Sequence, residues 1–224
     1  MSNYSVKEMY YTLQGEGFHS GRAAVFCRFS GCNLWNGKEA DRATSSCYFC
    51  DTDFVGTNGI NGGKYSSAEV LAKKIKDIWH LGVLDTSETS AISESSTNSS
   101  TQPMVVFTGG EPTLQLDSQL ISACRQLGFY TAIETNGTNL VTSGVDWITV
   151  SPKPNAKVLQ TSGNELKLVF PHSVNPRDIA HWKFENYFLS PMTVSDAQVQ
   201  KQNINAAINY CLRNPQWKLT MQYH

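Results

Sequence analysis

The sequence predicts an α/β fold built on a mostly parallel sheet, and three observations lead to that prediction. Short apolar runs that suit strands alternate along the chain with three-to-four-residue periodicities that suit helices. Many of these runs end at glycine, proline or asparagine, which mark turns. The chain has 224 residues, 40% of them apolar, which suits one domain with a sizeable core. Such alternation is typical of parallel α/β sheets.

Two helices are expected in the first half of the chain. The segment 67–79 places its apolar residues on one stripe, and Ser66 and Glu69 form a plausible capping box in front of it. A second helix is expected over 117–128, where Gly128 would be the stop. The neighbouring strands are expected at AVFCRF (23–28) and MVVF (104–107).

The second half continues the alternation of strands and helices. Strands are expected at YTAIE (130–134), WITV (147–150), ELKLVF (165–170), YFL (187–189) and KLTM (218–221). A long helix fits 196–214, directly before Pro215. The chain contains no visible internal repeat, so we expect a single domain over 1–224.

Residues 84–102 interrupt this pattern with a segment rich in serine and threonine. Eleven of the sixteen residues 86–101 are Ser or Thr, and only Ala91 and Ile92 are apolar. Such a segment buries too little surface to offset the entropy lost on ordering. We expect a disordered insertion within the domain, with a functional lid as the alternative.

Charge and cysteine content argue against several classes of protein. The net charge is −1 and no basic block occurs, which argues against direct nucleic-acid binding. No apolar run approaches the roughly 20 residues of a membrane span, and residues 1–17 lack a signal-peptide core. We therefore expect a cytoplasmic protein, in which the six cysteines are metal or redox ligands before they are disulfides.

Three of the cysteines form a candidate metal site. Cys32 is separated by fourteen residues from Cys47, which forms a C-x2-C pair with Cys50. Thiolates bind soft metals, and a C-x2-C pair can bring both sulfurs to one centre. From the residues alone an iron–sulfur cluster with an open iron, a zinc site completed by Asp51, and no metal all remain open. The remaining three are expected to be small core residues: Cys27, Cys124 and Cys211.

Polar residues follow several predicted strands and form a second candidate group. TGGEPTL (108–114) follows an apolar strand, where Gly110 allows close backbone approach and Glu111 could accept from an ammonium group. Three further segments follow other strands: Glu134–Gly137, Ser151–Lys153 and Ser190–Met192. Each alone suits an ordinary turn. If the strands are parallel, however, all of them converge on one rim of the sheet.

Two further polar sites lie near the N-terminus. Gln14 and Glu16, in YTLQGEG, suit the hydrogen-bonding edge of a planar heterocycle, although an ordinary loop is the alternative. Arg28 alternates with apolar residues in a predicted strand, and a cation inside a sheet needs an anionic partner. That partner is either a structural carboxylate or a substrate carboxylate.

These motifs together resemble one family. GCNLWNG, CYFCDTDF, TGGEP, IETNG, VSPK and TLQGEG resemble the 7-carboxy-7-deazaguanine synthases of the radical S-adenosylmethionine superfamily. Many radical enzymes carry C-x3-C-x2-C, whereas this chain resembles the subgroup with C-x14-C-x2-C. The resemblance covers the chain except for the Ser/Thr-rich insertion. A glycyl-radical activating enzyme and a zinc-stabilised binding module are the alternatives.

The resemblance implies a fold, a reaction and partners. The fold would be an abbreviated, partial (β/α)6-type barrel, assembled as a homodimer. The reaction would be a radical-mediated ring contraction of 6-carboxy-5,6,7,8-tetrahydropterin to 7-carboxy-7-deazaguanine with release of ammonia, a carbon–nitrogen lyase step in queuosine biosynthesis. The implied cofactors are a 4Fe–4S cluster, S-adenosylmethionine and Mg²⁺, with an external, flavodoxin-like electron donor.

The resemblance also assigns residues by motif. The cluster ligands would be Cys32, Cys47 and Cys50, and Thr52 would bind Mg²⁺. S-adenosylmethionine would contact Phe49, Cys50, Asp51, Gly110, Glu111, Ser151, Pro152, Lys153, Ser190, Pro191, Met192 and Thr193. The pterin substrate would contact Leu13, Gln14, Gly15, Arg28, Thr108 and His224. MQYH ends the sequence where the family usually reads MQTHK, which puts substrate affinity in doubt.

Overall fold

The structure is a computed structural model, and it describes residues 3–85, 102–172 and 174–222. These residues contain one nine-stranded sheet in the order β3-β1-β2-β4-β5-β6-β7-β8-β9. The strands are β1 (Tyr4–Leu13), β2 (Ala23–Phe29), β3 (Gly63–Tyr65), β4 (Met104–Gly109), β5 (Tyr130–Thr135), β6 (Trp147–Val150), β7 (Ser162–Phe170), β8 (Lys183–Pro191) and β9 (Trp217–Leu219). The helices are α1 (Ala68–Asp85), α2 (Ser118–Gln126) and α3 (Ala197–Arg213), with short 3-10 turns η1 (Glu39–Thr44) and η3 (Pro112–Leu114).

The prediction of a mostly parallel α/β sheet is confirmed. Each neighbouring pair from β2 to β9 in the sheet order is parallel, while β1 pairs antiparallel with both β2 and β3. Both β3 and β9 are edges, so the curved sheet is open, as expected of a partial rather than a closed barrel.

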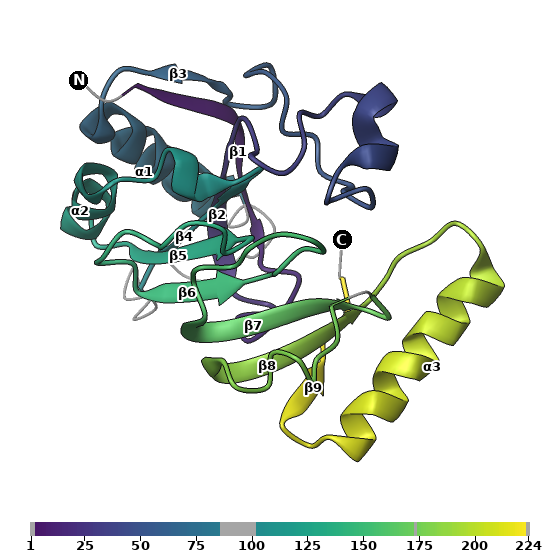
Figure 1. Cartoon of the computed structure of the whole chain (residues 1–224). Coiled ribbons are helices and arrows are strands. Elements are labelled where there is room, and N and C mark those ends of the chain that lie inside the picture. The colour runs from purple at the N-terminus through teal and green to yellow at the C-terminus, as the bar shows by residue number, and fades with distance from the viewer. Residues whose placement is uncertain (1–2, 86–101, 173, 223–224) are drawn as a thin grey trace.

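The helices cover one face of the sheet and leave the other face for a site. One apolar core lies between α1, α2 and strands β1, β2, β4 and β5, and a second lies between α3 and strands β7 to β9. Figure 1 shows these helices in two separate groups along the sheet. The opposite face carries a small apolar cluster, and some of its residues line a small pocket together with the polar Gln14 and Glu134. Within the described residues no helix has the length and apolar character needed to cross a membrane.

Helix α1 begins one residue later than its predicted cap implied. The hydroxyl of Ser67, not Ser66, accepts from the backbone N–H of Val70 at 3.3 Å. The Glu69 side chain hydrogen-bonds to Ser67, which lowers its pKa. At the other end α1 runs to Asp85, so residues 84 and 85, expected in the insertion, are helical. Residues 86–101 of that predicted insertion lie outside the described part of the chain.

Strand β1 is not predicted by the sequence pattern, because it contains a bulge. The pairing of β1 with β2 shifts between Val6 and Glu8, so Val6, Lys7 and Met9 are all buried. A bulge inserts one extra residue and breaks the two-residue alternation that identifies a strand. Consequently the strand that lies beside the first predicted one went unrecognised. The short strand β3 was missed as well.

Candidate active site

The carboxyl ends of the parallel strands surround a cavity of about 730 Å³. Residues of β1, β2, β4, β5, β7 and β8 and the segment directly after β6 line it, and the loop between β1 and β2 forms its floor. One wall is the segment from Cys32 to Phe54, which lies between β2 and β3 in the chain. Ligands bind at this edge in parallel α/β folds because the strand-end loops converge there.

Most residues predicted for the site line this one cavity. They are Leu13, Gln14, Gly15, Arg28, Cys32, Cys47, Phe49, Cys50, Asp51, Thr52, Thr108, Gly110, Ser151, Lys153, Ser190, Pro191, Met192 and Thr193. Glu111 and Pro152 are buried and are not among its lining residues. His224 lies outside the described residues, so its assignment stays a prediction.

The cysteines share the same wall and influence one another. Cys47 and Cys50 hydrogen-bond through their side chains, which raises the pKa of the Cys47 thiol and lowers that of Cys50 to about 6. Burial raises the pKa of Cys32, opposed by the backbone N–H of Leu34, which donates to its sulfur at 3.4 Å. A thiolate-prone cysteine beside two other thiols is a soft donor set.

This donor set fits a three-cysteine iron–sulfur cluster. All three sulfur-bearing residues face one cavity, whose remaining space is available to a further ligand. Each cysteine of a cluster binds a different iron, so the sulfurs need not converge on one point. The described residues contain no group of three or more Cys, His, Asp or Glu side chains arranged to hold a single metal ion.

Glu111 is a buried acceptor rather than an open one. Its carboxylate accepts from the N–H and hydroxyl of Thr113 at 3.0 and 2.5 Å, from the Thr135 hydroxyl at 2.6 Å and from the Asn136 N–H at 2.8 Å. It therefore ties the end of β4 to the end of β5. Gly110, by contrast, lines the cavity, and a Cβ there would lie 2.1 Å from the carbonyl oxygen of Gly31. The backbone approach predicted from the Gly-Gly pair is thus a tight contact between the two strand-end loops.

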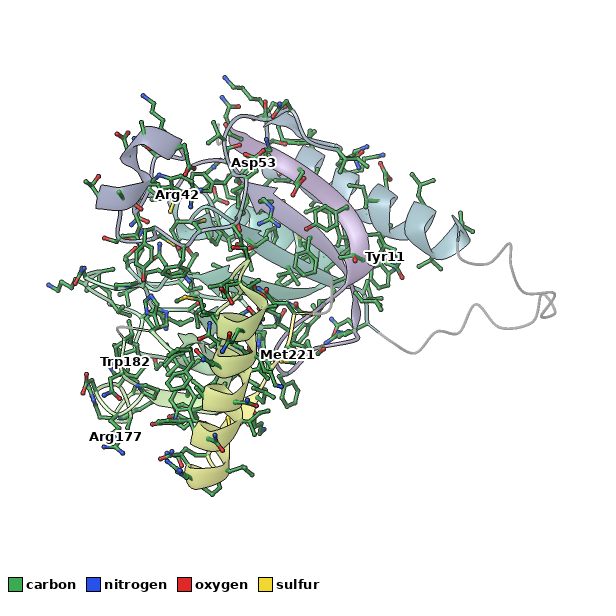
Figure 2. The ribbon with its side chains drawn as sticks, turned by 90° about the vertical axis from the view of Figure 1, so that its right-hand side faces the viewer. Tyr11, Arg42, Asp53, Arg177, Trp182 and Met221 are labelled. Carbon is green, nitrogen blue, oxygen red and sulfur yellow. The ribbon has the colours of Figure 1, made fainter. Side chains whose placement is uncertain are left out.

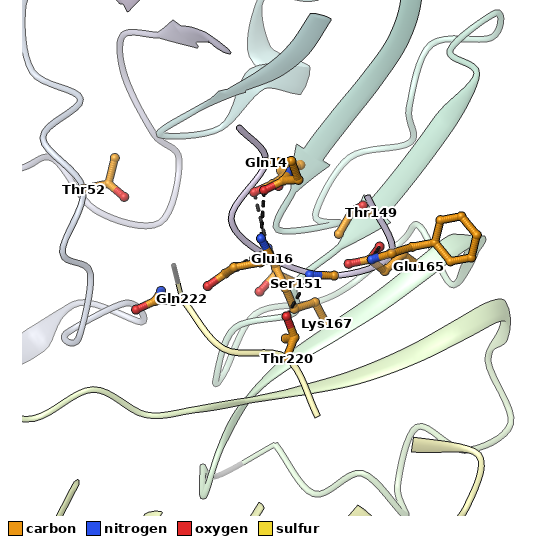
Figure 3. Close-up of polar contacts among 12 residues, drawn as sticks. Gln14, Glu16, Thr52, Thr149, Ser151, Glu165, Lys167, Thr220 and Gln222 are labelled. Atoms are coloured by element: carbon orange, nitrogen blue, oxygen red, sulfur yellow. Dashed lines mark hydrogen bonds and ion pairs between the residues drawn. The ribbon is translucent and has the colours of Figure 1, made fainter. Parts of the chain in front are cut away.

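Charged side chains lie on the floor of the cavity. The amide of Gln14 donates to Glu134 at 2.8 Å, and its oxygen accepts from the backbone N–H of Glu16. The ammonium of Lys167 contacts the carboxylates of Glu16 at 2.5 Å and Glu134 at 3.5 Å. Although burial alone would lower the pKa of Lys167, these carboxylates and Glu165 raise it overall. Lys167 therefore stays cationic and holds the loop of Gln14 against β5 and β7 (Figure 3).

Two backbone N–H groups of the same loop donate to side chains of other segments. The N–H of Phe18 donates to the buried carboxylate of Glu165 at 3.1 Å, and the N–H of Gly17 donates to the hydroxyl of Thr220 at 2.8 Å. The ring of Phe18 stacks on Trp147, with centroids 4.9 Å apart. Burial raises the pKa of Glu165, against the opposing effect of Lys167. The loop from Gln14 to Phe18 is thereby fixed to strands β6, β7 and the segment after β9.

Arg28 has a structural carboxylate as its partner. Its Nε donates to Glu8 at 2.9 Å and its Nη2 to the hydroxyl of Tyr10 at 3.2 Å, and all three residues line the cavity. The two alternatives left open by the sequence are therefore compatible, because a guanidinium carries five N–H donors and Arg28 lines the cavity.

Lys153 lies beside the cysteine pair. Its ammonium donates to the hydroxyl of Ser151 at 2.8 Å and lies 5.8 Å from the ring centroid of Phe49. Burial lowers the pKa of this lysine, and Cys47 partly opposes that effect. The end of β6 thus places a cation next to the C-x2-C segment.

Comparison with known proteins identifies the family. No protein-family model matches the chain. The 7-carboxy-7-deazaguanine synthase of Caulobacter vibrioides is 51% identical over 222 residues, which cover 99% of this chain and 96% of that protein. The chain belongs to the 7-carboxy-7-deazaguanine synthase family. The synthase of Bordetella pertussis is 50% identical over the same coverage, and that of Nitratidesulfovibrio vulgaris is 44% identical.

A solved structure agrees with this membership. The crystal structure of QueE from Escherichia coli covers 99% of this chain and 95% of its own, with a TM-score of 0.62 and 25% identity. The predicted family, its enzymatic character and its α/β fold are confirmed for this 7-carboxy-7-deazaguanine synthase family member. The relatives do not favour the glycyl-radical activating enzyme or the zinc-stabilised module.

Part of the cavity of this family member was not predicted from its sequence. Glu8 and Tyr10 were missed because β1 was not recognised. Lys167 was passed over although a signal was present. In ELKLVF the charged Glu165 and Lys167 alternate with the buried Leu166 and Leu168, which indicates a strand with charges on its inner face. Like Arg28, Lys167 is a cation inside a sheet, which needs an anionic partner.

Proposed function

We propose that the chain is a 7-carboxy-7-deazaguanine synthase, a radical S-adenosylmethionine lyase that converts 6-carboxy-5,6,7,8-tetrahydropterin to 7-carboxy-7-deazaguanine and ammonia. The observation that carries the proposal is the convergence of Cys32, Cys47 and Cys50 with the strand-end motifs on one cavity. The named relatives support it, because nearly the full length of the chain aligns with synthases of that product.

The three cysteines are proposed to hold a 4Fe–4S cluster. When bound, the cluster and S-adenosylmethionine supply the radical chemistry, as cofactors do in enzymes of this kind. The chain would bind the cofactor through Gly110 and the backbone of Phe49 to Asp51. Ser151, Lys153 and Ser190 to Thr193 would complete that pocket, with buried Glu111 and Pro152 supporting the two loops from behind.

The floor of the cavity is proposed to bind the substrate. Gln14 and the carboxylates of Glu16 and Glu134 offer acceptors that suit the N–H groups of a planar heterocycle. The ammonium of Lys167 contacts both carboxylates and fixes their positions. On the opposite side Arg28 offers a cation to the substrate carboxylate, and Leu13, Gly15 and Thr108 shape the space between them.

Mg²⁺ is proposed to bind at Thr52. The hydroxyl of Thr52 lies 3.4 Å from a carboxylate oxygen of Asp51, and both residues line the cavity. Oxygen ligands suit Mg²⁺, which keeps waters and commonly completes its shell with substrate oxygens. A Thr52→Val variant should then raise the substrate KM and weaken the dependence of turnover on Mg²⁺, whereas Thr12→Val, also at the cavity wall, should leave the Mg²⁺ dependence intact.

Metal analysis and a product assay test the function. Anaerobically purified protein should be brown and carry about four irons and four sulfides per chain. Incubated with reductant, S-adenosylmethionine, Mg²⁺ and carboxytetrahydropterin, it should form the deazaguanine product by mass spectrometry. A content of one zinc and no iron per chain would contradict the proposal. An intact cluster in a protein that forms no product would contradict it as well. Cys50→Ala should lose both cluster and turnover.

A homodimer and a flavodoxin-like electron donor complete the proposal. Both follow from the family rather than from contacts in the single chain. Light scattering coupled to size exclusion should give a mass near twice 24.8 kDa. Turnover with reduced flavodoxin as the sole donor should reach that obtained with a chemical reductant, and a monomer or an inactive flavodoxin would contradict the respective part.

A further inference from the structure

The long segment between the first two cysteines folds around one arginine, Arg42 of η1. Its guanidinium lies over the ring of Trp35, 4.3 Å from the centroid, and its Nε lies 2.8 Å from both carboxylate oxygens of Glu39. Trp35 is buried and packs edge-on against Phe54, with centroids 5.5 Å apart. These ring contacts fix the position of Arg42 relative to Trp35 and Phe54.

The same guanidinium reaches the cysteine pair. Its Nη1 donates to the carbonyl of Tyr48 at 3.0 Å and to the carbonyl of Cys50 at 2.8 Å. Figure 2 labels Arg42 at this projecting part of the molecule, on the same side as Asp53. The C-x2-C turn is further closed by the N–H of Cys50, which donates to the carbonyl of Cys47 at 3.0 Å. A single side chain therefore joins the fourteen-residue segment to the C-x2-C turn that follows it.

An ordinary surface ion pair does not account for this arrangement. A partly exposed pair between Arg42 and Glu39 at a spacing of three residues contributes little by itself. The two carbonyl contacts and the ring contact use the planar fork of the guanidinium, which a lysine cannot reproduce. Charge-assisted bonds to backbone carbonyls are also stronger than neutral ones.

We propose that Arg42 is a positioning residue for the iron–sulfur cluster: it presets the Cys47–Cys50 turn and keeps a fixed positive charge beside it. This inference rests on the proposed cluster site. Arg42 acts through backbone oxygens and the ring of Trp35, so its effect is on ligand geometry and cluster potential. The role would explain what the long first gap of this subgroup provides that a three-residue gap cannot, namely a side chain that returns to the cysteine pair.

Two substitutions separate geometry from charge. Arg42→Ala removes both, and Arg42→Lys keeps the charge while losing the fork. We expect iron loss to a chelator to become about tenfold faster in Arg42→Ala, as for the loss of one charge-assisted bond. Arg42→Lys should also lose iron faster. The reduction potential should become more negative in Arg42→Ala and stay near that of the wild type in Arg42→Lys, because a nearby cation favours the reduced cluster.

A matched control and a metal-free measurement accompany these variants. Arg125 likewise donates to a backbone carbonyl, that of Gly144 at 3.0 Å, but on α2 and not at the cavity. Arg125→Ala should leave iron loss and potential unchanged. In chains stripped of iron, alkylation of Cys47 and Cys50 and amide exchange over 47–50 should be faster in Arg42→Ala than in the wild type.

The outcomes distinguish this inference from the proposed function. If Arg42→Ala has the same rate of iron loss, reduction potential and rate of amide exchange as the wild type, the proposed role of Arg42 is overturned. A wild-type chain that holds no iron–sulfur cluster would overturn the proposed function and with it the cluster role. If Arg42→Ala does not fold by circular dichroism, Arg42→Gln is the second variant. It removes the charge and the fork of donors, so it should lose iron faster and have a more negative reduction potential than the wild type. Wild-type values of both in that variant would count against the proposal.

Discussion

At the scale of single residues, the motif that contains Glu111 could be recognised in the sequence, but the main contacts of its side chain could not. The strand-end position indicated a functional carboxylate, yet this side chain is fully buried and satisfied by donors from two segments. Those donors lie up to 25 residues away in the sequence, which no local pattern encodes. Its contact with S-adenosylmethionine stays a prediction, whereas its role in joining β4 to β5 is visible.

Glu111→Gln should destabilise the protein. The amide keeps the shape of the carboxylate but turns an NH₂ toward a donor and removes the charge. We expect the free energy of unfolding to fall by about 2 kcal/mol. Urea denaturation of the metal-free chain measures it. Glu185→Gln, at an exposed position, is the control and should change stability by less than about 0.5 kcal/mol.

A side chain at Gly17 should destabilise the protein through a steric clash. Comparison with Gly21 separates that clash from the effect of the backbone conformation. Gly17 and Gly21 both have positive φ, +69° and +84°, which disfavours alanine at either. A Cβ at Gly17 would meet the Glu165 carboxylate at 2.1 Å, whereas one at Gly21 meets nothing within 4 Å. Gly17→Ala should therefore cost about 2 kcal/mol more than Gly21→Ala. It should also raise the substrate KM, because the clash displaces the loop of Gln14. Equal losses in both variants would contradict this reading of the loop.

At the scale of elements, local pattern predicted the strands and helices that obey it. Helix α1 buries Leu71, Ile75 and Ile78 as its stripe indicated. Strand β1 escaped because its bulge breaks the alternation. Strand β7 was placed correctly, but its inward charges were not interpreted, because their partners come from the loop of Glu16 and from β5. The elements were predictable where their signals are local, and the pairings between them were not.

Strand β7 should make stability depend on pH through Glu165. Burial raises the pKa of this carboxyl above its ordinary value of 4.5. Its contribution to stability is fully present below that value and is lost as pH rises through the raised pKa. The unfolding free energy of the wild type should therefore fall relative to Glu165→Gln as pH rises above 4.5. Urea titrations of both proteins across this range measure the difference, and parallel curves would count against it.

At the scale of the whole molecule, the cavity and the apolar cores occupy different places. The two larger cores lie between the sheet and the helices, while the cavity lies at the strand ends on the other face. The cysteine wall contributes Trp35, Cys47 and Phe54 to the buried residues, yet none of them belongs to a core cluster. Most of the residues assigned by family resemblance line this cavity, while the charged residues of its floor were recognised only in the three-dimensional structure.

Removal of iron should therefore leave the sheet folded. Chelation should leave the far-ultraviolet circular dichroism nearly unchanged, while proteolysis within 36–46 becomes faster. The urea midpoint should drop, because a ligand bound only by the folded state stabilises it by about 2.7 kcal/mol at one hundred times its Kd. Cys47→Ala should show the lower midpoint with or without iron. Loss of the dichroism on chelation would show that the cluster supports the whole fold.

The bond between Gly17 and Thr220 has a practical consequence for anyone handling this protein. It ties the segment after β9 to the floor of the cavity, and Gln222, two residues further on, lines the cavity itself. An affinity tag or fluorescent fusion attached directly after Gln222 would begin at a residue that lines the cavity and would crowd it. One attached ahead of β1 would emerge near β3, at the far edge of the sheet (Figure 1). Purification handles and surface immobilisation are best placed at the amino end.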